Sequence, residues 1–282
     1  MQPYTLNKST FSHITSTPAI LTEPDRAIIY PAAFPDDARR NLMRPSDNPF
    51  FIKDFEELMI PTPDHETLSA FYIRADQSGI KKRNTTILMF HGNAGNIGHR
   101  IPIAKRLIGS LGCNVLMLEY RGYGLSTGSP DQDGLMVDAQ TGYDYLRSRA
   151  ETRDHDIIIY GQSLGGAVSI QLVSKNQNDP KLVGLILENT FLSIRKLIPS
   201  YVFDRPSNLK TKLTETRIMP PAKYLAMFCH QVWPSDNIIP SITEVPILFL
   251  SGLQDEIVPY VFRPFKSHAC IALFPSCNKT IS

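Results

Sequence analysis

Short apolar runs alternate with amphipathic stretches along most of this chain. Runs of about four to eight β-branched or aromatic residues are typical of strands, whereas apolar positions that recur every three or four residues are typical of helices. Residues 61–65 are predicted to form a turn between the first two strands. The pattern predicts strands at 55–60, 67–74, 86–90, 114–118, 157–160, 183–187, 246–250 and 271–274, and helices at 101–111, 135–149 and 167–173.

The order of these elements indicates the fold class. Continuous apolar strands with helices between them are typical of a mostly parallel central sheet that helices cover on both faces, so an α/β fold is predicted. Residues 1–50 are rich in Pro, Ser and Thr and lack periodicity, which predicts an irregular N-terminal arm. Residues 51–282 are predicted to form one domain.

A long connection with several prolines, residues 190–245, interrupts the alternation. It contains Trp233 and an apolar helical stretch at 222–228. Active sites of such sheets lie beyond the carboxyl ends of the strands, so this lid-like insertion has two interpretations. It is either a lid over the active site or a helical excursion that only packs on the sheet.

Composition narrows the function classes. The 282 residues, of which 42% are hydrophobic, suffice for a sizeable core. A net charge of +2 without a basic run predicts no nucleic-acid partner. Four scattered cysteines without a C-x-x-C pair, and the lack of a phosphate-binding loop, predict no metal and no cofactor. No apolar run reaches the length of a membrane span, so the chain is expected to carry no anchor of its own.

The most informative stretch is Gly161-x-Ser163-x-Gly165, directly between a predicted strand and a predicted helix. This is the context of a nucleophile elbow, in which a sharp strand-to-helix turn holds a serine hydroxyl exposed. Glycines two residues on either side avoid collisions with the neighbouring strand and helix. Ser163 is therefore predicted to be a catalytic nucleophile, and the N–H of Leu164 a candidate oxyanion donor.

A second loop follows the strand at 86–90, at the same predicted edge of the sheet. Its small residues let the backbone approach a reacting carbonyl, and the N–H of Asn93 or Ala94 is a candidate second oxyanion donor. His91 is a rival candidate for the general base. Its place at a strand end beside Gly92 favours a role in ordering the loop.

A third loop, with the sequence E-Y-R-G-Y-G, follows the strand at 114–118. Its glycines permit a tight turn beside the pocket. Tyr120 and Arg121 are therefore candidate pocket-loop residues, together with His91 and Gly92. Arg121 is expected to tie its loop down rather than to touch substrate.

A carboxylate late in the chain completes the candidate chemistry. Asp255 follows the predicted strand at 246–250, within the sequence S-G-L-Q-D-E-I-V-P. In a triad with the order Ser, Asp, His, the acid falls at such a strand end and holds the imidazole in the correct tautomer. Asp255 is favoured over Glu256, and a solvated loop carboxylate is the simpler alternative.

The motifs G-Q-S-L-G-G, F-H-G-N-A-G-N, E-Y-R-G-Y-G-x-S and S-G-x-x-D-E-x-V-P resemble those of the α/β-hydrolase superfamily. More narrowly, they resemble the bud-emergence-type hydrolases of fungi and their animal α/β-hydrolase-domain-containing relatives. The resemblance implies a serine hydrolase with Ser163 as nucleophile, Asp255 as acid, and Asn93 and Leu164 as oxyanion donors. It also implies an esterase or thioesterase that acts on a small-molecule or acylated-protein substrate, including palmitoylated cysteine. Membrane association and a cytoplasmic or endomembrane location are expected from the same resemblance.

One departure from the family pattern concerns the catalytic histidine. The family places it in an H-N-D-T-like loop after the last strand, where this chain has C-N-K-T at 277–280, and the final helix is expected to be missing. His268 precedes that strand and His230 lies in the insertion, so neither is expected to serve as the base. The Cys277 thiol does not replace an imidazole, because it is mostly protonated at neutral pH. Impaired or absent turnover and reduced stability are therefore expected.

Two hypotheses stay open. In the first, the chain belongs to a catalytic serine hydrolase of esters or thioesters, and its tail is that of a truncated or alternatively spliced product. In the second, it is a pseudo-hydrolase that keeps the pocket for binding or scaffolding. The complete elbow, acid and oxyanion loop favour the first, because a strained serine has little physical use without catalysis.

Overall fold

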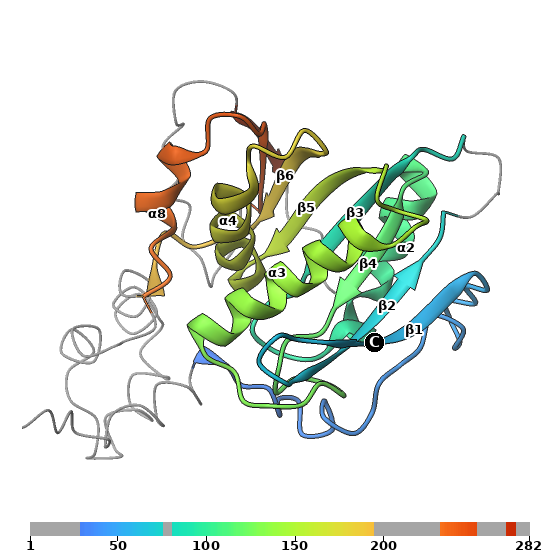
Figure 1. Ribbon diagram of the computed structural model, residues 1–282. Coiled ribbons are helices and arrows are strands. Elements are labelled where there is room, and N and C mark those ends of the chain that lie inside the picture. Colours follow the sequence, from blue (N-terminus) through green and yellow to red (C-terminus); the bar gives the residue numbers. More distant parts are fainter. Residues whose placement is uncertain (1–28, 76–80, 195–231, 253–268, 275–282) are drawn as a thin grey trace, which may run out of the picture.

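The computed structural model describes residues 29–75, 81–194, 232–252 and 269–274 (Figure 1). Within these ranges, the helices are α2 (Ile101–Leu111), α3 (Gln132–Ser148), α4 (Leu164–Asn176) and α8 (Ser235–Ile238), with the 3-10 turns η2 (Ile97–Arg100) and η3 (Ile239–Ser241). The strands are β1 (Phe55–Pro61), β2 (Thr67–Ile73), β3 (Thr85–Phe90), β4 (Asn114–Leu118), β5 (Asp156–Gln162), β6 (Leu182–Glu188), β7 (Ile247–Gly252) and β8 (Ala269–Phe274).

The described strands form one sheet in the order β1-β2-β4-β3-β5-β6-β7-β8. β2 is antiparallel to both of its neighbours, and every other neighbouring pair is parallel. The carboxyl ends of the parallel strands therefore meet at one edge, where Phe90 of β3 pairs with Leu118 of β4 and Gly161 of β5. This confirms the mostly parallel sheet predicted from the sequence.

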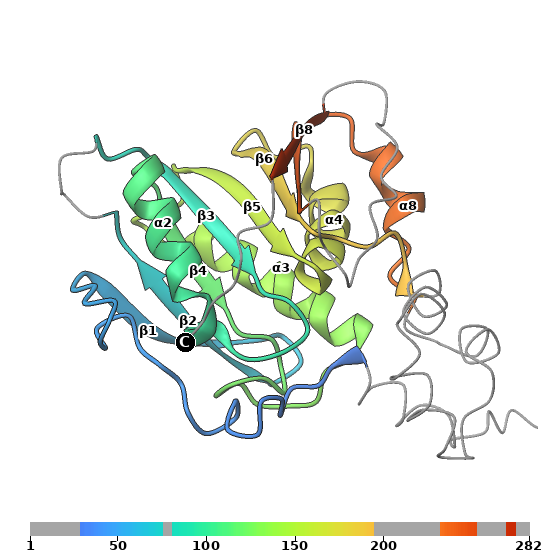
Figure 2. The same ribbon diagram turned by 180° about the vertical axis from the view of Figure 1, so that it is seen from behind.

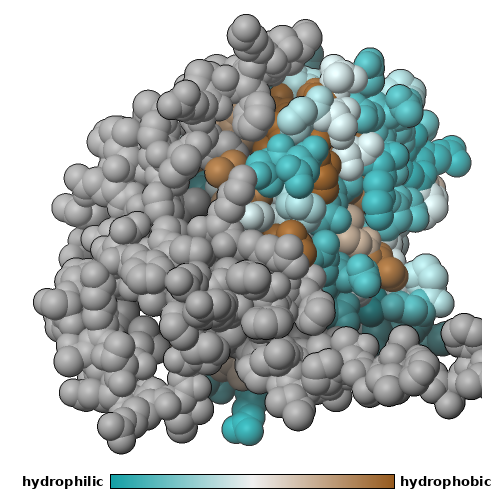
Figure 3. Space-filling view, turned by 90° about the vertical axis from the view of Figure 1, so that its left-hand side faces the viewer, coloured by the Kyte–Doolittle hydropathy of each residue, from teal (hydrophilic) through white to brown (hydrophobic). Residues whose placement is uncertain are grey.

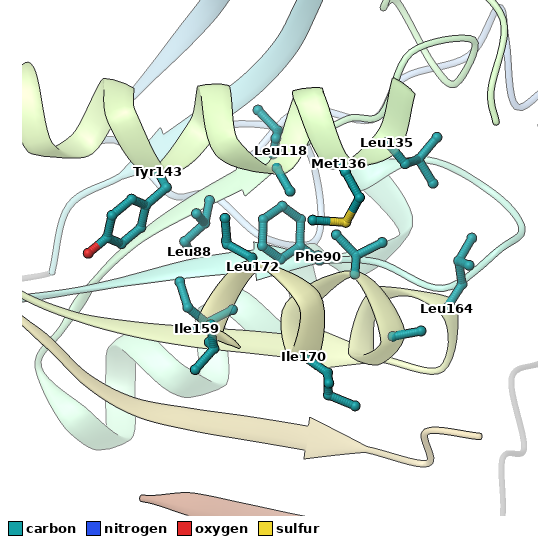
Figure 4. Packing of buried hydrophobic residues seen from close by; sticks show 14 of the residues in the cluster. Leu88, Phe90, Leu118, Leu135, Met136, Tyr143, Ile159, Leu164, Ile170 and Leu172 are labelled. Atoms are coloured by element: carbon teal, nitrogen blue, oxygen red, sulfur yellow. The ribbon is translucent and has the colours of Figure 1, made fainter. Parts of the chain in front are cut away.

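Helices cover both faces of this sheet. α3 and α4 lie on one face (Figure 1), and α2 lies on the other (Figure 2). Successive residues of β3 serve the two faces in turn: Leu88 and Phe90 belong to the core under α3 and α4 (Figure 4), while Ile87 and Met89 belong to the core under α2. A strand buried on both faces needs this continuous apolar run.

Two helices begin earlier than the sequence pattern predicts. α3 begins at Gln132 rather than at 135, because the Asp131 side chain accepts a hydrogen bond from Gly134 N at 2.7 Å and caps the helix. Its first turn is polar, so hydrophobic periodicity does not reveal it. α4 begins at Leu164 rather than at 167, and the ends of the other predicted elements lie within two residues of those observed.

The described part of the N-terminal arm, residues 29–50, consists mainly of turns and contains no strand. It packs closely on the rest of the chain. Ile29 and Tyr30 are buried in the core on the α3 side, and Leu42 is buried in the core on the α2 side. Trp233 Nε1 donates a hydrogen bond to Tyr30 Oη at 2.9 Å. The arm therefore contributes to both cores.

The insertion predicted at 190–245 is described only at its two ends. Ile194 N donates to Val232 O at 3.1 Å, so the chain leaves and re-enters the fold at one place. Gln132 Oε1, in the first turn of α3, accepts hydrogen bonds from Val232 N at 2.9 Å and Trp233 N at 3.2 Å. α8 then packs against α4. The apolar stretch at 222–228 lies outside the described residues.

The surface of the described part is mixed in polarity. None of its helices combines the length and the apolar character needed to cross a bilayer. On the face drawn in Figure 3, hydrophobic side chains lie among hydrophilic ones. The most exposed large apolar side chains in the described ranges are Phe34 and Phe51, both 64% exposed and both near or within the arm.

Two arginines tie the β1–β2 edge of the sheet to the end of α3. Arg74 Nε lies 2.8 Å from Glu151 Oε1, and Arg74 also pairs with Glu56 of β1. Arg149 Nη2 lies 2.7 Å from carboxylate oxygens of both Glu56 and Glu151, and its guanidinium lies 4.5 Å above the ring of Tyr72. The hydrogen bond from Arg74, the largest cause, helps to lower the pKa of Glu151 to about 2.

Glu151→Gln is expected to remove a stabilisation that depends on pH. A carboxylate whose pKa is lowered by folding stabilises the folded state above its unfolded value of 4.5, and this stabilisation is lost as the pH falls toward about 2. Because the side chain is 30% exposed, solvent screens the pair, and the effect at neutral pH is about 1 kcal/mol. Urea unfolding of both proteins should show a difference that is largest near neutral pH and shrinks below pH 4.5.

Glu57→Gln is the matched control for this prediction. Glu57 pairs with Arg44 at 2.7 Å, but the two side chains are 44% and 48% exposed. Such surface pairs contribute about 0–1 kcal/mol, so this variant should stay close to wild type. A Glu151→Gln effect that is the same at every pH would contradict the electrostatic explanation.

Candidate active site

Ser163 lies at a sharp turn between β5 and α4, at the carboxyl edge of the sheet. Its backbone has φ 52° and ψ −113°, a region that residues with a side chain rarely occupy. Ser163 N donates to Glu188 O of β6 at 2.9 Å, and Gly166 N donates to Ser163 O at 2.9 Å. The β5–β6 ladder therefore ends at Ser163, the residue directly before α4.

The glycines on either side of Ser163 are required by close packing. A Cβ at Gly161 would overlap the carbonyl oxygen of Gly165, and a Cβ at Gly165 would overlap the carbonyl oxygen of Phe90. Neither glycine has a positive φ, so lack of space rather than backbone conformation excludes a side chain. The elbow thus packs directly against the end of β3.

The loop that follows β3 also lies against the elbow. A Cβ at Gly92 would lie 3.7 Å from Ser163 Cβ. Leu164 is the first residue of α4, where a helix supplies no acceptor for the N–H. The N–H groups of Asn93 and Ala94 have no acceptor within the described residues either. Unpaired N–H groups beside a serine at a helix start are what an oxyanion site requires.

His91 is buried, 1% exposed, against the rings of Tyr120 and Tyr123. Its Nδ1 lies 2.7 Å from Gly92 O, and because a carbonyl only accepts, Nδ1 carries a hydrogen. Its Nε2 lies 2.9 Å from Oε1 of the buried Glu119, although the two atoms are not aligned as a hydrogen bond. Both ring nitrogens therefore face protein groups, an arrangement that suits a residue ordering the loop.

Tyr120 and Tyr123 hold the backbone of the same loop. Tyr120 Oη donates to His91 O at 3.0 Å, and Tyr123 Oη donates to Asn93 O at 2.9 Å. Burial raises the pKa of both phenols well above their ordinary value, so both remain hydrogen-bond donors at neutral pH. Tyr120, a predicted pocket-loop residue, thus acts on the loop backbone.

Arg121 is engaged in ion pairs. Its backbone N and its Nε donate to Asp138 of α3 at 2.7 and 2.9 Å, and its two terminal nitrogens donate to Asp64 at 2.7 and 3.1 Å. Burial raises the pKa of Asp138 to about 6, whereas the hydrogen bond from Arg121 lowers the pKa of Asp64 to about 2. The guanidinium is occupied in holding its loop to α3 and to the β1–β2 turn.

The predicted acid, Asp255, lies outside the described residues, and so do His230, His268 and Cys277. The strand before Asp255 is described. β7 ends at Gly252 and runs parallel to β6, so it ends at the same edge of the sheet as β5. Asp255 follows this end by three residues.

The other described histidines either lie away from Ser163 or use a ring nitrogen in another hydrogen bond. His65 lies in the β1–β2 turn, and His155 precedes β5 at the opposite edge of the sheet. His99 Nδ1 accepts a hydrogen bond from Asn96 N at 3.1 Å. An imidazole base for Ser163 therefore has to come from outside the described residues.

Metal-binding side chains do not gather anywhere in the described part of the chain. No group of three or more His, Cys, Asp or Glu residues there could hold an ion. Cys113 is a buried free thiol, and burial raises its pKa. Its environment is that of a packing residue.

The sequence prediction did not single out Glu119, Asn96 or Arg100, which all support the loop after β3. Glu119 Oε2 accepts from Ile97 N at 2.9 Å, and Arg100 Nη2 donates to Ala94 O at 3.1 Å. Two signals were available. Glu119 directly follows the apolar run at 115–118, and Asn96 stands three residues before a histidine, which is the spacing of a capping box.

Three relatives are similar to this chain along most of its length. Protein bem46 of Schizosaccharomyces pombe is 40% identical over 234 residues, which cover 83% of this chain and 71% of that protein. The α/β-hydrolase domain-containing protein WAV2 of Arabidopsis thaliana is 39% identical over 229 residues, 79% of this chain and 69% of that protein. The uncharacterized membrane protein YNL320W of Saccharomyces cerevisiae is 35% identical over 268 residues, which cover 95% of this chain and 83% of that protein.

Solved structures show the same fold. An α/β hydrolase from Vibrio vulnificus has a TM-score of 0.63 at 20% identity, over 84% of this chain and 79% of that one. The Pyrococcus furiosus esterase Pf2001 has a TM-score of 0.55 at 19% identity, over 73% of this chain and 74% of that one. Residues 81–238 match the family described as serine aminopeptidase, S33. The chain therefore belongs to this family of the α/β-hydrolase superfamily and is homologous to bem46 and WAV2.

Proposed function

We propose that this chain is a serine hydrolase that cleaves carboxylic esters or thioesters, with Ser163 as its nucleophile. The observation that carries the proposal is the serine with φ 52° between β5 and α4, with the glycine-containing loop after β3 packed against it. Backbone strain of this kind costs about 1–3 kcal/mol and clusters at active sites. The family membership is consistent with this chemistry.

In the proposed reaction, the Ser163 hydroxyl attacks the acyl carbon while an imidazole takes its proton. The N–H groups of Asn93 and Leu164 bind the oxyanion of the tetrahedral intermediate. Collapse of the intermediate expels the alcohol or thiol, to which the imidazole returns the proton, and water then releases the acid. Asp255 holds the imidazole in the correct tautomer, a role supported by its position just after β7 at the same edge of the sheet.

The substrate class we propose is a small-molecule ester or an acylated protein, including a protein with palmitate on cysteine. The Pyrococcus structure is described as an esterase, which supports ester chemistry in this fold. The yeast relative is described as a membrane protein, which supports a place of action at a membrane surface. Acylated proteins reside at such surfaces because their chains insert into the bilayer.

Labelling with a fluorophosphonate tests the nucleophile. We expect wild-type protein to react covalently but slowly, because Cys277 stands where the family has its histidine. Ser163→Ala should show no labelling above background, because the probe bonds to the serine oxygen. Ser174→Ala is the matched control, since its hydroxyl lies on the same helix and donates to Gln171 O at 2.9 Å. This control should label at the wild-type rate.

Cys277→His tests the position of the base. Loss of the base from such a triad lowers turnover by about a million-fold, so restoring an imidazole should speed labelling greatly. If folded wild type and Cys277→His both stay unlabelled, the proposal is wrong. That result would favour the alternative, a pseudo-hydrolase that keeps the pocket for binding or scaffolding.

A further inference from the structure

The loop between β3 and η2 has consecutive carbonyl groups held by side chains. His91 Nδ1 donates to Gly92 O at 2.7 Å, and Tyr123 Oη donates to Asn93 O at 2.9 Å. In a trans peptide, a carbonyl and the N–H that follows it point in opposite directions. Fixing these two carbonyls therefore fixes the directions of the N–H groups of Asn93 and Ala94.

The far end of the same loop is held by the N-terminal arm. Gly95 N donates to Phe34 O at 2.8 Å. Asn96 Nδ2 donates to Ala38 O at 2.9 Å and to Asn41 O at 3.0 Å. The Asn96 side chain is 0% exposed, so water does not compete for these bonds.

Asn96 joins the arm, the loop and η2 through a single amide. Its Oδ1 accepts from His99 N at 3.4 Å, and its backbone N donates to His99 Nδ1 at 3.1 Å, which caps η2. The arm and η2 are also in close contact, because a Cβ at Gly98 would lie 2.7 Å from Met43 O. An asparagine supplies two donors and an acceptor from one short side chain, and aspartate supplies acceptors only.

We propose that Asn96 is a positioning residue for the oxyanion loop, and that it acts by fixing the end of this loop to the N-terminal arm. The inference rests on the proposed function. Asn96 does not touch substrate; it acts through the loop backbone, where the N–H group of Asn93 must stay aligned with the oxyanion. Oxyanion donors act mainly in the transition state, so loss of the clamp slows the chemical step and leaves binding of the ligand unchanged.

Asn96→Asp removes the hydrogen bonds from Asn96 to the arm, here called the clamp, but keeps the hydrogen bond that caps η2. It keeps the size of the side chain and the acceptor for His99 N, but it places an oxygen opposite the carbonyl oxygens of Ala38 and Asn41. Fluorophosphonate labelling at several probe concentrations gives the maximal rate constant and the half-saturating concentration. We expect the rate constant to fall by about tenfold or more, with the half-saturating concentration within about twofold of wild type.

Asn41→Ala is the matched control. The Asn41 side chain is in the same arm but exposed, with Asp37 Oδ2 at 3.3 Å from its Nδ2, and the substitution leaves the backbone carbonyl in place. Its labelling rate should stay within about twofold of wild type. Equal loss of rate in both variants would show general loosening of the arm and overturn the assignment to Asn96.

The outcomes also separate this inference from the function on which it rests. Labelled wild type with an unchanged rate in Asn96→Asp would overturn the inference alone. Folded wild type and folded Cys277→His that both stay unlabelled would overturn the proposed function and the inference with it. If Asn96→Asp does not fold, Gly98→Ala takes its place, since a Cβ there would press on the Met43 backbone and displace the arm. A lower maximal rate constant in Gly98→Ala, with an unchanged half-saturating probe concentration, would support the role of the arm in positioning the loop. Wild-type kinetics in a folded Gly98→Ala would contradict it.

Discussion

Gly165→Ala is expected to destabilise the protein by about 3 kcal/mol and to abolish labelling of Ser163. A Cβ at this position would overlap the carbonyl oxygen of Phe90 and lie 2.7 Å from His91 O. Both atoms belong to the backbone at the end of β3, so neither can rotate away as a side chain can. Overpacking costs about 1–3 kcal/mol, with the upper end expected where backbone must move. This corresponds to a fall of about 6–12 °C in the melting temperature.

Gly109→Ala in α2 is the matched control for this variant. A Cβ at Gly109 would meet nothing within 4 Å, and alanine is favoured over glycine in a helix by about 1 kcal/mol. The two glycine-to-alanine changes should therefore shift the melting temperature in opposite directions. A Gly165→Ala protein that melts with wild type would mean that the elbow does not pack tightly on β3.

The sheet could be predicted from the sequence because its strands are buried on both faces. After their first polar residues, β3 and β4 read as uninterrupted apolar runs at 87–90 and 115–118. Such runs can be recognised without knowing which strands lie beside them. The gathering of the candidate loops at one edge followed from the parallel order alone. Ser163 and Gly92 follow different strands, yet a Cβ at Gly92 would lie 3.7 Å from Ser163 Cβ.

The supports of the site could not be predicted, because their partners are distant in sequence or are backbone atoms. Asp64 and Asp138 lie 57 and 17 residues from Arg121, and no periodicity relates them. The arm binds the loop after β3 through the carbonyls of Phe34 and Ala38. Every residue has a backbone carbonyl, so the sequence does not show which carbonyls accept hydrogen bonds from the loop.

Asp138→Ala is expected to destabilise the protein by about 3–5 kcal/mol, because it leaves a buried guanidinium without its buried partner. Asp138 is 0% exposed and accepts from Arg121 N at 2.7 Å and from Arg121 Nε at 2.9 Å. The Arg121 side chain is only 9% exposed, and its other partner, Asp64, is 43% exposed. Because Asp64 is partly solvated, it does not compensate for the loss of the buried Asp138 carboxylate. The loop of Arg121 also carries Tyr120 and Tyr123, so labelling of Ser163 should slow as well.

Two further variants test whether burial of the pair causes this loss. Asp154 is 86% exposed and 3.5 Å from Arg153, so Asp154→Ala should change the free energy of unfolding by less than about 0.5 kcal/mol. Arg121→Met with Asp138→Leu removes both charges and should recover most of the stability, since apolar replacement of a buried pair is often neutral. Urea unfolding within about 1 kcal/mol of wild type for Asp138→Ala would contradict the buried pair. Recovery of stability without recovery of labelling in the double variant would show that the pair is needed to position the loop.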